Sequence, residues 1–298
     1  MKKSLLIIGF CILQLSAFAQ LSARDMLRQR TERDLHKIVD SSPSLIGLMA
    51  VDLISGESIG INADLVFAQA SAIKIPILME VYKQAHDKKF ALTDIKPLIP
   101  SNTVAGSGIL NAMPDPVNLS IRNYCMLMIG LSDNSATNTL IELVGLKNVS
   151  NTMQSLGFGN TRLQRKMIDQ QASLRNEENI STPAEAVRIM KLLYDGKFID
   201  KNSSEEIISI LKKNPIENSK ISLGVPANVK LAFKPGGMGG VSTEWAIVYL
   251  QNRPYALAIM ENYKTAASPS NTFTLLSKRI FDHFSRMKAS NYGVLIDN

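Results

Sequence analysis

The hydrophobic pattern of this chain places short β-like runs near both of its ends. Five runs of β-branched and aromatic residues predict strands, at positions 45–54, 57–61, 229–233, 241–250 and 255–261. Ser55-Gly56 separates the first two runs as a hairpin turn would, and an Asn-Arg-Pro segment at 252–254 separates the last two. We therefore expect a sheet that is assembled from both ends of the chain.

The middle of the chain has the periodicity of helices. Between positions 70 and 213, apolar residues recur three and four places apart, most clearly at 73–81, 121–129, 137–144 and 184–194. Two further helices, at about 22–39 and 269–287, flank the strands and are expected to cover one face of the sheet. The pattern predicts an all-helical lobe inserted between the two groups of strands.

The first nineteen residues have the features of an export signal. Lys2 and Lys3 precede an almost unbroken apolar run from position 5 to 15, and Ala17-Phe18-Ala19 forms a small-x-small cleavage site. The run is too short to span a bilayer. Cys11 lies within the run and no cysteine follows the cleavage site directly, so a lipid anchor is not expected. We expect a periplasmic or secreted protein with no stable membrane anchor.

Composition narrows the classes of function. Loss of the signal lowers the formal net charge from +7 to +5, and the remaining Lys and Arg residues are scattered, which argues against nucleic-acid binding. The mature chain keeps one cysteine, Cys125, so it has no internal disulfide. Its three histidines, His36, His86 and His283, lack the spacing of metal ligands. We expect a monomer with no metal and no other cofactor.

The segment Ser71-Ala72-Ile73-Lys74 carries the most specific chemical signal. A serine hydroxyl is a poor nucleophile at neutral pH, and a lysine one helical turn away takes its proton only if the amine is neutral. Apolar neighbours of Lys74 favour a neutral amine, because burial lowers the pKa of lysine. The alternative is a solvated surface amine. The same spacing recurs at Ser209 and at Ser285, where it is typical of a solvated helix face.

Two further motifs distinguish Ser71 from the other two serines. Ser132-Asp133-Asn134 lies between two helical segments, where it is either an ordinary helix cap or a hydroxyl and an amide that serve a substrate. Lys234-Pro235-Gly236 lies on a strand and precedes Gly237, and the missing side chains allow a ligand to approach the backbone. Its alternative interpretation is a glycine-rich turn. The three motifs in this order indicate one nucleophilic site.

These residues resemble the penicillin-recognising serine hydrolases, and specifically the class A β-lactamase branch. The resemblance extends over positions 70–76, 106–108, 132–144, 161–183 and 234–255. It implies a β-lactamase or DD-peptidase-like fold of the class α/β plus all-α, with a five-stranded antiparallel sheet, flanking terminal helices and an inserted helical lobe. The expected boundaries are 1–19 for the signal peptide, 20–62 with 219–298 for a discontinuous α/β lobe, and 63–218 for the all-α lobe.

The resemblance also implies roles for individual residues. Ser71 is expected to be the nucleophile, Lys74 the acylation base and Ser132 the proton relay to the leaving nitrogen. The backbone N–H groups of Ser71 and Gly237 are expected to form the oxyanion hole. The implied substrate is a small β-lactam or a peptidoglycan-related molecule. The positions expected to bind it are Asn134, Lys234, Gly236 and Gly237.

The chain departs from the class A pattern in the loop that follows Thr161-Arg162-Leu163-Gln164-Arg165. The family carries a glutamate there that activates the deacylating water, and this chain has Met167 at that position. Asp169 is the nearest carboxylate and is therefore a candidate catalytic residue for deacylation. The alternative is a structural role for Asp169 as a partner of Arg162 or Arg165.

A second departure concerns the carboxylate of the substrate. Pro235 stands where the family usually has a Thr or Ser, and Glu244 and Trp245 occupy the region of a carboxylate-binding arginine. Losing one charge-assisted hydrogen bond in a dry site costs about 1.5 to 3 kcal/mol. We expect weaker binding of β-lactams unless Lys220 supplies a cation from the neighbouring segment.

Three functions fit the sequence. The first is a class A β-lactamase-like hydrolase that opens β-lactams, or related amides and esters, through an acyl-serine intermediate. The second is a D-alanyl-D-alanine carboxypeptidase or penicillin-binding protein that releases its acyl group slowly. The third is a non-catalytic envelope binding or sensor protein that has kept the fold. The motifs around Ser71 argue against the third, while the missing glutamate does not separate the first two.

Overall fold

The computed structural model describes residues 22–289 and 292–294. The predicted export signal at 1–19 lies outside these residues. Within them, no helix combines the length and the apolar character needed to cross a membrane.

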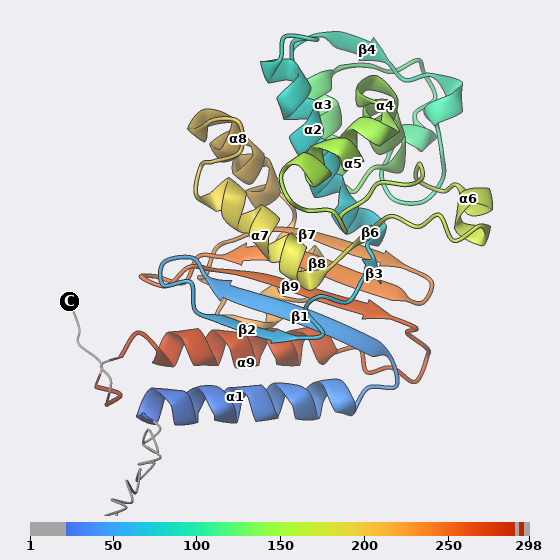
Figure 1. The fold of residues 1–298 in the computed structure, drawn as a ribbon. Helices are drawn as coiled ribbons and strands as arrows, with labels where there is room; N and C mark the ends of the chain where they lie inside the picture. Colours follow the sequence, from blue (N-terminus) through green and yellow to red (C-terminus); the bar gives the residue numbers. More distant parts are fainter. Residues whose placement is uncertain (1–21, 290–291, 295–298) are drawn as a thin grey trace, which may run out of the picture.

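A five-stranded antiparallel sheet forms the centre of the molecule (Figure 1). Its strand order is β2-β1-β9-β8-β7, so strands from the two ends of the chain pair in the middle of the sheet. The strands are β1 (Leu45–Asp52), β2 (Ser58–Ile61), β7 (Leu231–Met238), β8 (Val241–Val248) and β9 (Tyr255–Asn262). This arrangement confirms the predicted fold class.

The two terminal helices cover one face of this sheet, as α1 (Ala23–Asp40) and α9 (Thr272–Arg286) (Figure 1). Ser22 and Asp25 form a capping box that starts α1, because each side chain accepts a hydrogen bond from the other residue's backbone N–H. Leu35 of α1 and Phe284 of α9 are fully buried in the apolar layer between helices and sheet. That layer fixes the helices to the sheet.

The remaining helices lie on the other face (Figure 1). They are α2 (Lys74–His86), α3 (Ile121–Gly130), α4 (Asn134–Val144), α5 (Leu146–Ser155), α6 (Gln170–Leu174), α7 (Pro183–Tyr194) and α8 (Lys201–Lys212). α7 packs directly on the sheet, and a second apolar core joins it to α2, α3, α4 and α8. The proposed boundaries of two lobes, at 62/63 and 218/219, stay a prediction.

Short elements connect these layers. The two-residue strands β3 (Phe67–Ala68) and β6 (Ile180–Ser181) pair between the sheet and the helices, and β4 (Ile95–Pro97) pairs with β5 (Asn118–Ser120). Five 3₁₀ turns complete the list: η1 (Ala70–Ile73), η2 (Pro100–Asn102), η3 (Leu110–Ala112), η4 (Ile216–Asn218) and η5 (Ser222–Gly224). Of these, η1 carries the predicted nucleophile.

β7 is longer than its hydrophobic run predicts. The run ends at Phe233, whereas the strand continues through Lys234-Pro235-Gly236 to Met238 by pairing with β8. A proline is tolerated because β7 is an edge strand, so its missing N–H can face away from the sheet. The extension brings Lys234 and the glycines onto a rigid element beside the start of α2.

Candidate active site

Ser71 lies in the 3₁₀ turn η1, immediately before α2. The sequence predicts Ser71 at an irregular helix start because Pro76 follows five residues later, and the change from 3₁₀ to α-helix at Lys74 is that irregularity. Pro76 thereby falls in the first turn of α2, where its missing N–H breaks no helical hydrogen bond. Ser71 is half-buried, and within the described residues its hydroxyl is hydrogen-bonded to no other residue.

Lys74 is fully buried and is not the solvated amine of the alternative interpretation. Its Nζ lies 2.6 Å from the carbonyl oxygen of Ser132, 3.0 Å from Ser132 Oγ and 3.0 Å from Asn134 Oδ1. Burial lowers the pKa of Lys74 well below its ordinary value, nearby Lys234 lowers it further, and Asp133 opposes the shift. The amine is therefore available as a base.

Lys234 reaches the same hydroxyl from β7. Its Nζ lies 3.1 Å from Ser132 Oγ and 2.9 Å from the carbonyl oxygen of Pro235. The side chain is almost fully buried, and burial lowers the pKa of Lys234 to about 7. Two ammonium groups on one hydroxyl repel each other, so the lysines favour a state with one positive charge between them.

One arrangement of protons in that state leaves Lys74 free to act as a base. A neutral Lys74 has two N–H groups for the Ser132 carbonyl and for Asn134 Oδ1, and its lone pair then accepts the hydroxyl proton of Ser132. The Ser132 oxygen in turn accepts from a charged Lys234. In this arrangement all three contacts of Lys74 are used, and Ser132 connects the base to the cation. A charged Lys74 that donates to all three oxygens, with a neutral Lys234, fits the same distances.

The loop between α3 and α4 holds Ser132 by a strained backbone. Ser132 has φ +53°, in the left-handed region that non-glycine residues rarely adopt. Asp133 stabilises this loop as the cap of α4, and it also accepts hydrogen bonds from the N–H groups of Ile109 and Leu110. The motif is therefore a helix cap, and this cap places Ser132 beside Lys74; its service to a substrate stays a prediction.

Two adjoining cavities of about 280 and 200 Å³ meet at Ser71. The first extends along β7 and is lined by Lys234, Gly236 and Gly237. Gly237 also lines the second, together with Asn134. A side chain at position 236 would collide with η1, since a Cβ atom there would lie 2.8 Å from the backbone N of Ala72. The structure thus brings all the predicted site residues except Asp169 to these two cavities or to their immediate wall.

Asp169 is exposed and lines neither cavity. It is the N-cap of α6, and its Oδ1 accepts a hydrogen bond from the N–H of Ala172 at 3.0 Å. The predicted arginine partners are engaged elsewhere in the described chain, since Arg165 pairs with Glu178 at 2.8 Å and Arg162 Nε donates to the carbonyl of Gly159. Activation of water by Asp169 stays a prediction that this position does not favour.

Met167 occupies the wall where the resemblance implies a glutamate. Its side chain is buried and lines the second cavity. Asn138 of α4 holds its backbone from both sides, because Met167 N–H donates to Oδ1 at 2.8 Å and Asn138 Nδ2 donates to the Met167 carbonyl at 3.3 Å. Within the described residues, no aspartate or glutamate lines either cavity.

Glu244 and Lys220 lie outside the lining of both cavities, and compensation by Lys220 stays a prediction. Glu244 is fully buried and accepts hydrogen bonds from the Ser219 hydroxyl and from the N–H groups of Lys220 and Ile221. Burial raises its pKa to about 7. Lys220 points to Ser242 Oγ at 3.1 Å and lines neither cavity.

The structure adds residues to the site that the sequence does not single out. Asn214 and the exposed Asn218 line the first cavity beside Lys234. The amide of Asn214 is already engaged, since its Nδ2 donates to the carbonyl oxygens of Ile129 and Phe233 at 3.2 and 3.4 Å. Gln69, just before η1, is fully buried and bonds to Trp245 of β8. A buried amide next to a nucleophile would indicate a residue of the site, but the local sequence around Gln69 does not show that it is buried.

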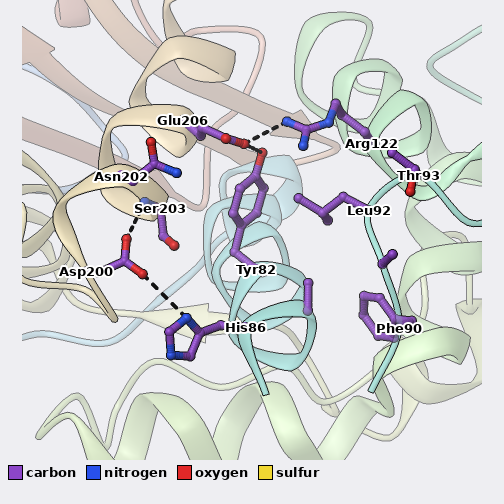
Figure 2. Close-up of a pocket in the computed structure, with 12 residues that line it drawn as sticks. Tyr82, His86, Phe90, Leu92, Thr93, Arg122, Asp200, Asn202, Ser203 and Glu206 are labelled. Carbon is purple, nitrogen blue, oxygen red and sulfur yellow. Dashed lines mark hydrogen bonds and ion pairs between the residues drawn. The ribbon is translucent and has the colours of Figure 1, made fainter. Parts of the chain in front are cut away.

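A separate surface cavity of about 340 Å³ lies between α2, α3 and α8 (Figure 2). Its charged side chains are already paired, since Tyr82 Oη and Arg122 both reach Glu206, and His86 faces Asp200 at 3.4 Å. No serine and lysine converge there. The candidate active site is therefore the pair of cavities at Ser71.

Known proteins resemble this chain over most of its length. A model described as the beta-lactamase enzyme family matches residues 30–284. An imipenem-hydrolyzing beta-lactamase from Enterobacter cloacae is 25% identical over 248 residues, which cover 82% of this chain and 82% of that protein. Beta-lactamase ROB-1 from Haemophilus influenzae is 27% identical over 267 residues, covering 86% and 83%.

Solved structures share the fold. PBP-A, as a mutant in an acyl-enzyme complex with penicillin G, matches with a TM-score of 0.79 at 23% identity and covers 86% of this chain and 97% of that chain. A class A beta-lactamase from Mycobacterium abscessus matches with a TM-score of 0.78 at 22% identity, covering 86% and 99%. At these identities the likeness concerns the fold alone.

Proposed function

This chain belongs to the beta-lactamase enzyme family, and from that premise we propose that it is an exported active-site-serine hydrolase whose Ser71 is acylated by β-lactams or related amides and esters. One observation carries the proposal. Ser71 borders both cavities, while two buried lysines, Lys74 and Lys234, meet at the hydroxyl of Ser132 beside it at 3.0 and 3.1 Å.

The proposed reaction begins with neutral Lys74, which takes the proton of Ser71 as the serine oxygen attacks the carbonyl carbon. The N–H groups of Ser71 and Gly237 donate hydrogen bonds to the carbonyl oxygen and stabilise the negative charge that develops on it. The carbon–nitrogen bond then breaks, and the leaving nitrogen takes a proton from Ser132, which regains one from Lys74. Lys234 supplies positive charge for an anionic substrate. Water finally hydrolyses the acyl-serine.

The test is the intact mass of the purified protein during incubation with benzylpenicillin. We expect a mass increase of one penicillin in wild type and none in Ser71→Ala. Ser209→Ala is the matched control, because Ser209 has the same spacing to a lysine but is exposed on α8. It is expected to react as wild type does. An adduct that persists in Ser71→Ala would overturn the assignment.

A second candidate is a D-alanyl-D-alanine carboxypeptidase or penicillin-binding protein with slow deacylation. It is favoured by the lining of the two cavities, which includes Met167 and, among the described residues, no carboxylate to activate water. The same mass experiment, followed in time after excess penicillin is removed, separates the candidates. Loss of the adduct within seconds supports β-lactamase turnover, and persistence for many minutes supports the second candidate.

A further inference from the structure

Gln69 is a fully buried amide two residues before Ser71. Its Nε2 lies 2.9 Å from the carbonyl oxygen of Phe67 and 3.4 Å from that of Ser181, and its Oε1 accepts a hydrogen bond from the indole N–H of Trp245 at 2.9 Å. Since carbonyls only accept and the indole only donates, one orientation of the amide fits these partners. One side chain thereby ties β3, β6 and β8 together at the residue that precedes η1.

The partners of Gln69 are in register with the catalytic strand. In the pairing of β7 with β8, Trp245 lies opposite Lys234 and Thr243 lies opposite Gly236. Thr243 Oγ1 donates to the backbone carbonyl of Gln69 at 2.8 Å. β8 therefore holds both the side chain and the backbone of Gln69, at the positions that face Lys234 and Gly236.

The chain between Gln69 and Ser71 needs such support. Ala70 has φ +42°, a backbone conformation that a non-glycine residue adopts only when its surroundings enforce it. The carbonyl of Gln69 also accepts the N–H of Ala72 at 2.9 Å, which closes the turn η1. Only the absence of a side chain at Gly236 lets β7 approach this turn, because a Cβ atom there would lie 2.8 Å from the Gln69 oxygen.

We propose that Gln69 is a positioning residue for Ser71. The contacts of its amide with Trp245, and of its carbonyl with Thr243, fix the strained corner at Ala70, and so set the distance between Ser71 and β7. The inference rests on the proposed function, because the reaction whose rate it sets is acylation of Ser71. A displacement of the nucleophile by about 1 Å costs up to about a hundredfold in rate, so the effect is expected in the acylation step.

The test compares single and double variants, so that stability and positioning separate. Gln69→Met keeps the side-chain volume and leaves the buried indole N–H of Trp245 without an acceptor, so a lower Tm and slower acylation are expected. The double variant Gln69→Met/Trp245→Phe also removes the unpaired indole N–H, while the carbonyl oxygens of Phe67 and Ser181 still lack their donor, so its Tm is expected to recover part of the loss. Its acylation rate constant with benzylpenicillin is expected to stay at least about tenfold below that of wild type. The benzylpenicillin concentration that gives half of the maximal rate is expected to change less than about threefold.

A double variant that recovers both Tm and acylation rate would overturn the proposal, because the amide would then serve stability alone. If the double variant does not fold, Thr243→Val carries the test: it removes one hydroxyl at nearly constant volume, and an unchanged acylation rate would contradict the inference. Tyr255→Phe is the control, since its buried hydroxyl has no hydrogen-bond partner among the described residues, and it is expected to acylate as wild type does. Wild type that neither forms an adduct nor hydrolyses benzylpenicillin would instead overturn the proposed function and this inference with it.

Discussion

Lys74 and Lys234 are two buried amines that share one hydroxyl, and within the described residues neither forms a salt bridge. The low pKa of both groups follows from burial first and from mutual repulsion for Lys74. A buried lysine without a counter-charge is expensive, and such groups concentrate at functional sites. The pair therefore points to proton transfer rather than to structural support.

Lys74→Ala is expected to slow acylation by about 10² to 10⁴, the scale of losing a general base. The reason is that the hydroxyl of Ser71 then has no neutral amine within reach, while the adduct, once formed, is chemically the same. Stopped-flow measurement with a chromogenic cephalosporin gives the rate constant. A loss of less than tenfold at neutral pH would place the base on another residue.

The second-order rate constant of acylation is expected to have a bell-shaped pH profile. It rises as the lysine pair loses its first proton and frees Lys74, and it falls above about pH 7 as Lys234 loses its charge and its hold on an anionic substrate. Lys234→Arg keeps a charge that does not titrate in this range, so the falling limb is expected to move at least one pH unit upward. A falling limb that stays in place would assign it to another group.

At the scale of elements, the loop from Thr161 to β6 supplies part of the wall of the second cavity. Arg165 and Glu178 clamp this loop, and Asn138 fixes the backbone of Met167 against α4. The loop is thus held in place with an apolar side chain toward the cavity. Among the described residues, no carboxylate lines this cavity to activate a water molecule.

Asp169→Asn is expected to leave the lifetime of the adduct within about twofold of wild type, because asparagine also caps a helix and the carboxylate lies outside both cavities. Met167→Glu is expected to shorten the lifetime, since it places a carboxylate at the cavity wall. Both lifetimes come from intact mass after removal of free penicillin. A much longer lifetime in Asp169→Asn would establish Asp169 as the base after all.

Elements with regular patterns are predictable from this sequence, and contacts across layers are not. β1, β8 and β9 follow from runs of β-branched residues, because burial of a whole strand leaves a local signature. The placement of Lys234-Pro235-Gly236 on a strand is predicted as well, although proline and glycines are poor strand formers; pairing with β8 overrides that preference and extends β7 to Met238. The bond from Trp245 to Gln69 spans 176 residues and depends on strand register, which no local pattern encodes.

At the scale of the whole molecule, the buried Lys234 of the site lowers the free energy of unfolding. The pKa of Lys234 falls from 10.5 to about 7 on folding, so the unfolded chain binds more protons between these pH values. The free energy of unfolding therefore rises with pH between 7 and 10.5, as the penalty of burying a charged Lys234 disappears. Below pH 7 the full penalty applies, at about 1.4 kcal/mol per unit of pKa shift. Activity and stability make opposite demands on one side chain.

Lys234→Met is expected to raise Tm by at least about 4 °C at pH 7, because it fills the same space without a buried amine, and to abolish fast acylation. The gain is expected to shrink as pH approaches 10. Calorimetry at both pH values measures it, with Lys197→Met as the control because Lys197 is largely exposed. An equal Tm in wild type and Lys234→Met at pH 7 would show that the lysine is not destabilising.

The seam between β1 and β9 joins residue 45 to residue 262 along eight paired positions. A ribosome makes the N-terminal end first, so β1 and β2 exist for most of synthesis as a lone hairpin, which is marginal in water. The edge of β1 that pairs with β9 stays unpaired until the last part of the chain emerges, and pairings so distant in sequence form slowly. The nascent chain is therefore most prone to aggregation late in its synthesis, just before the last sixty or so residues complete the sheet.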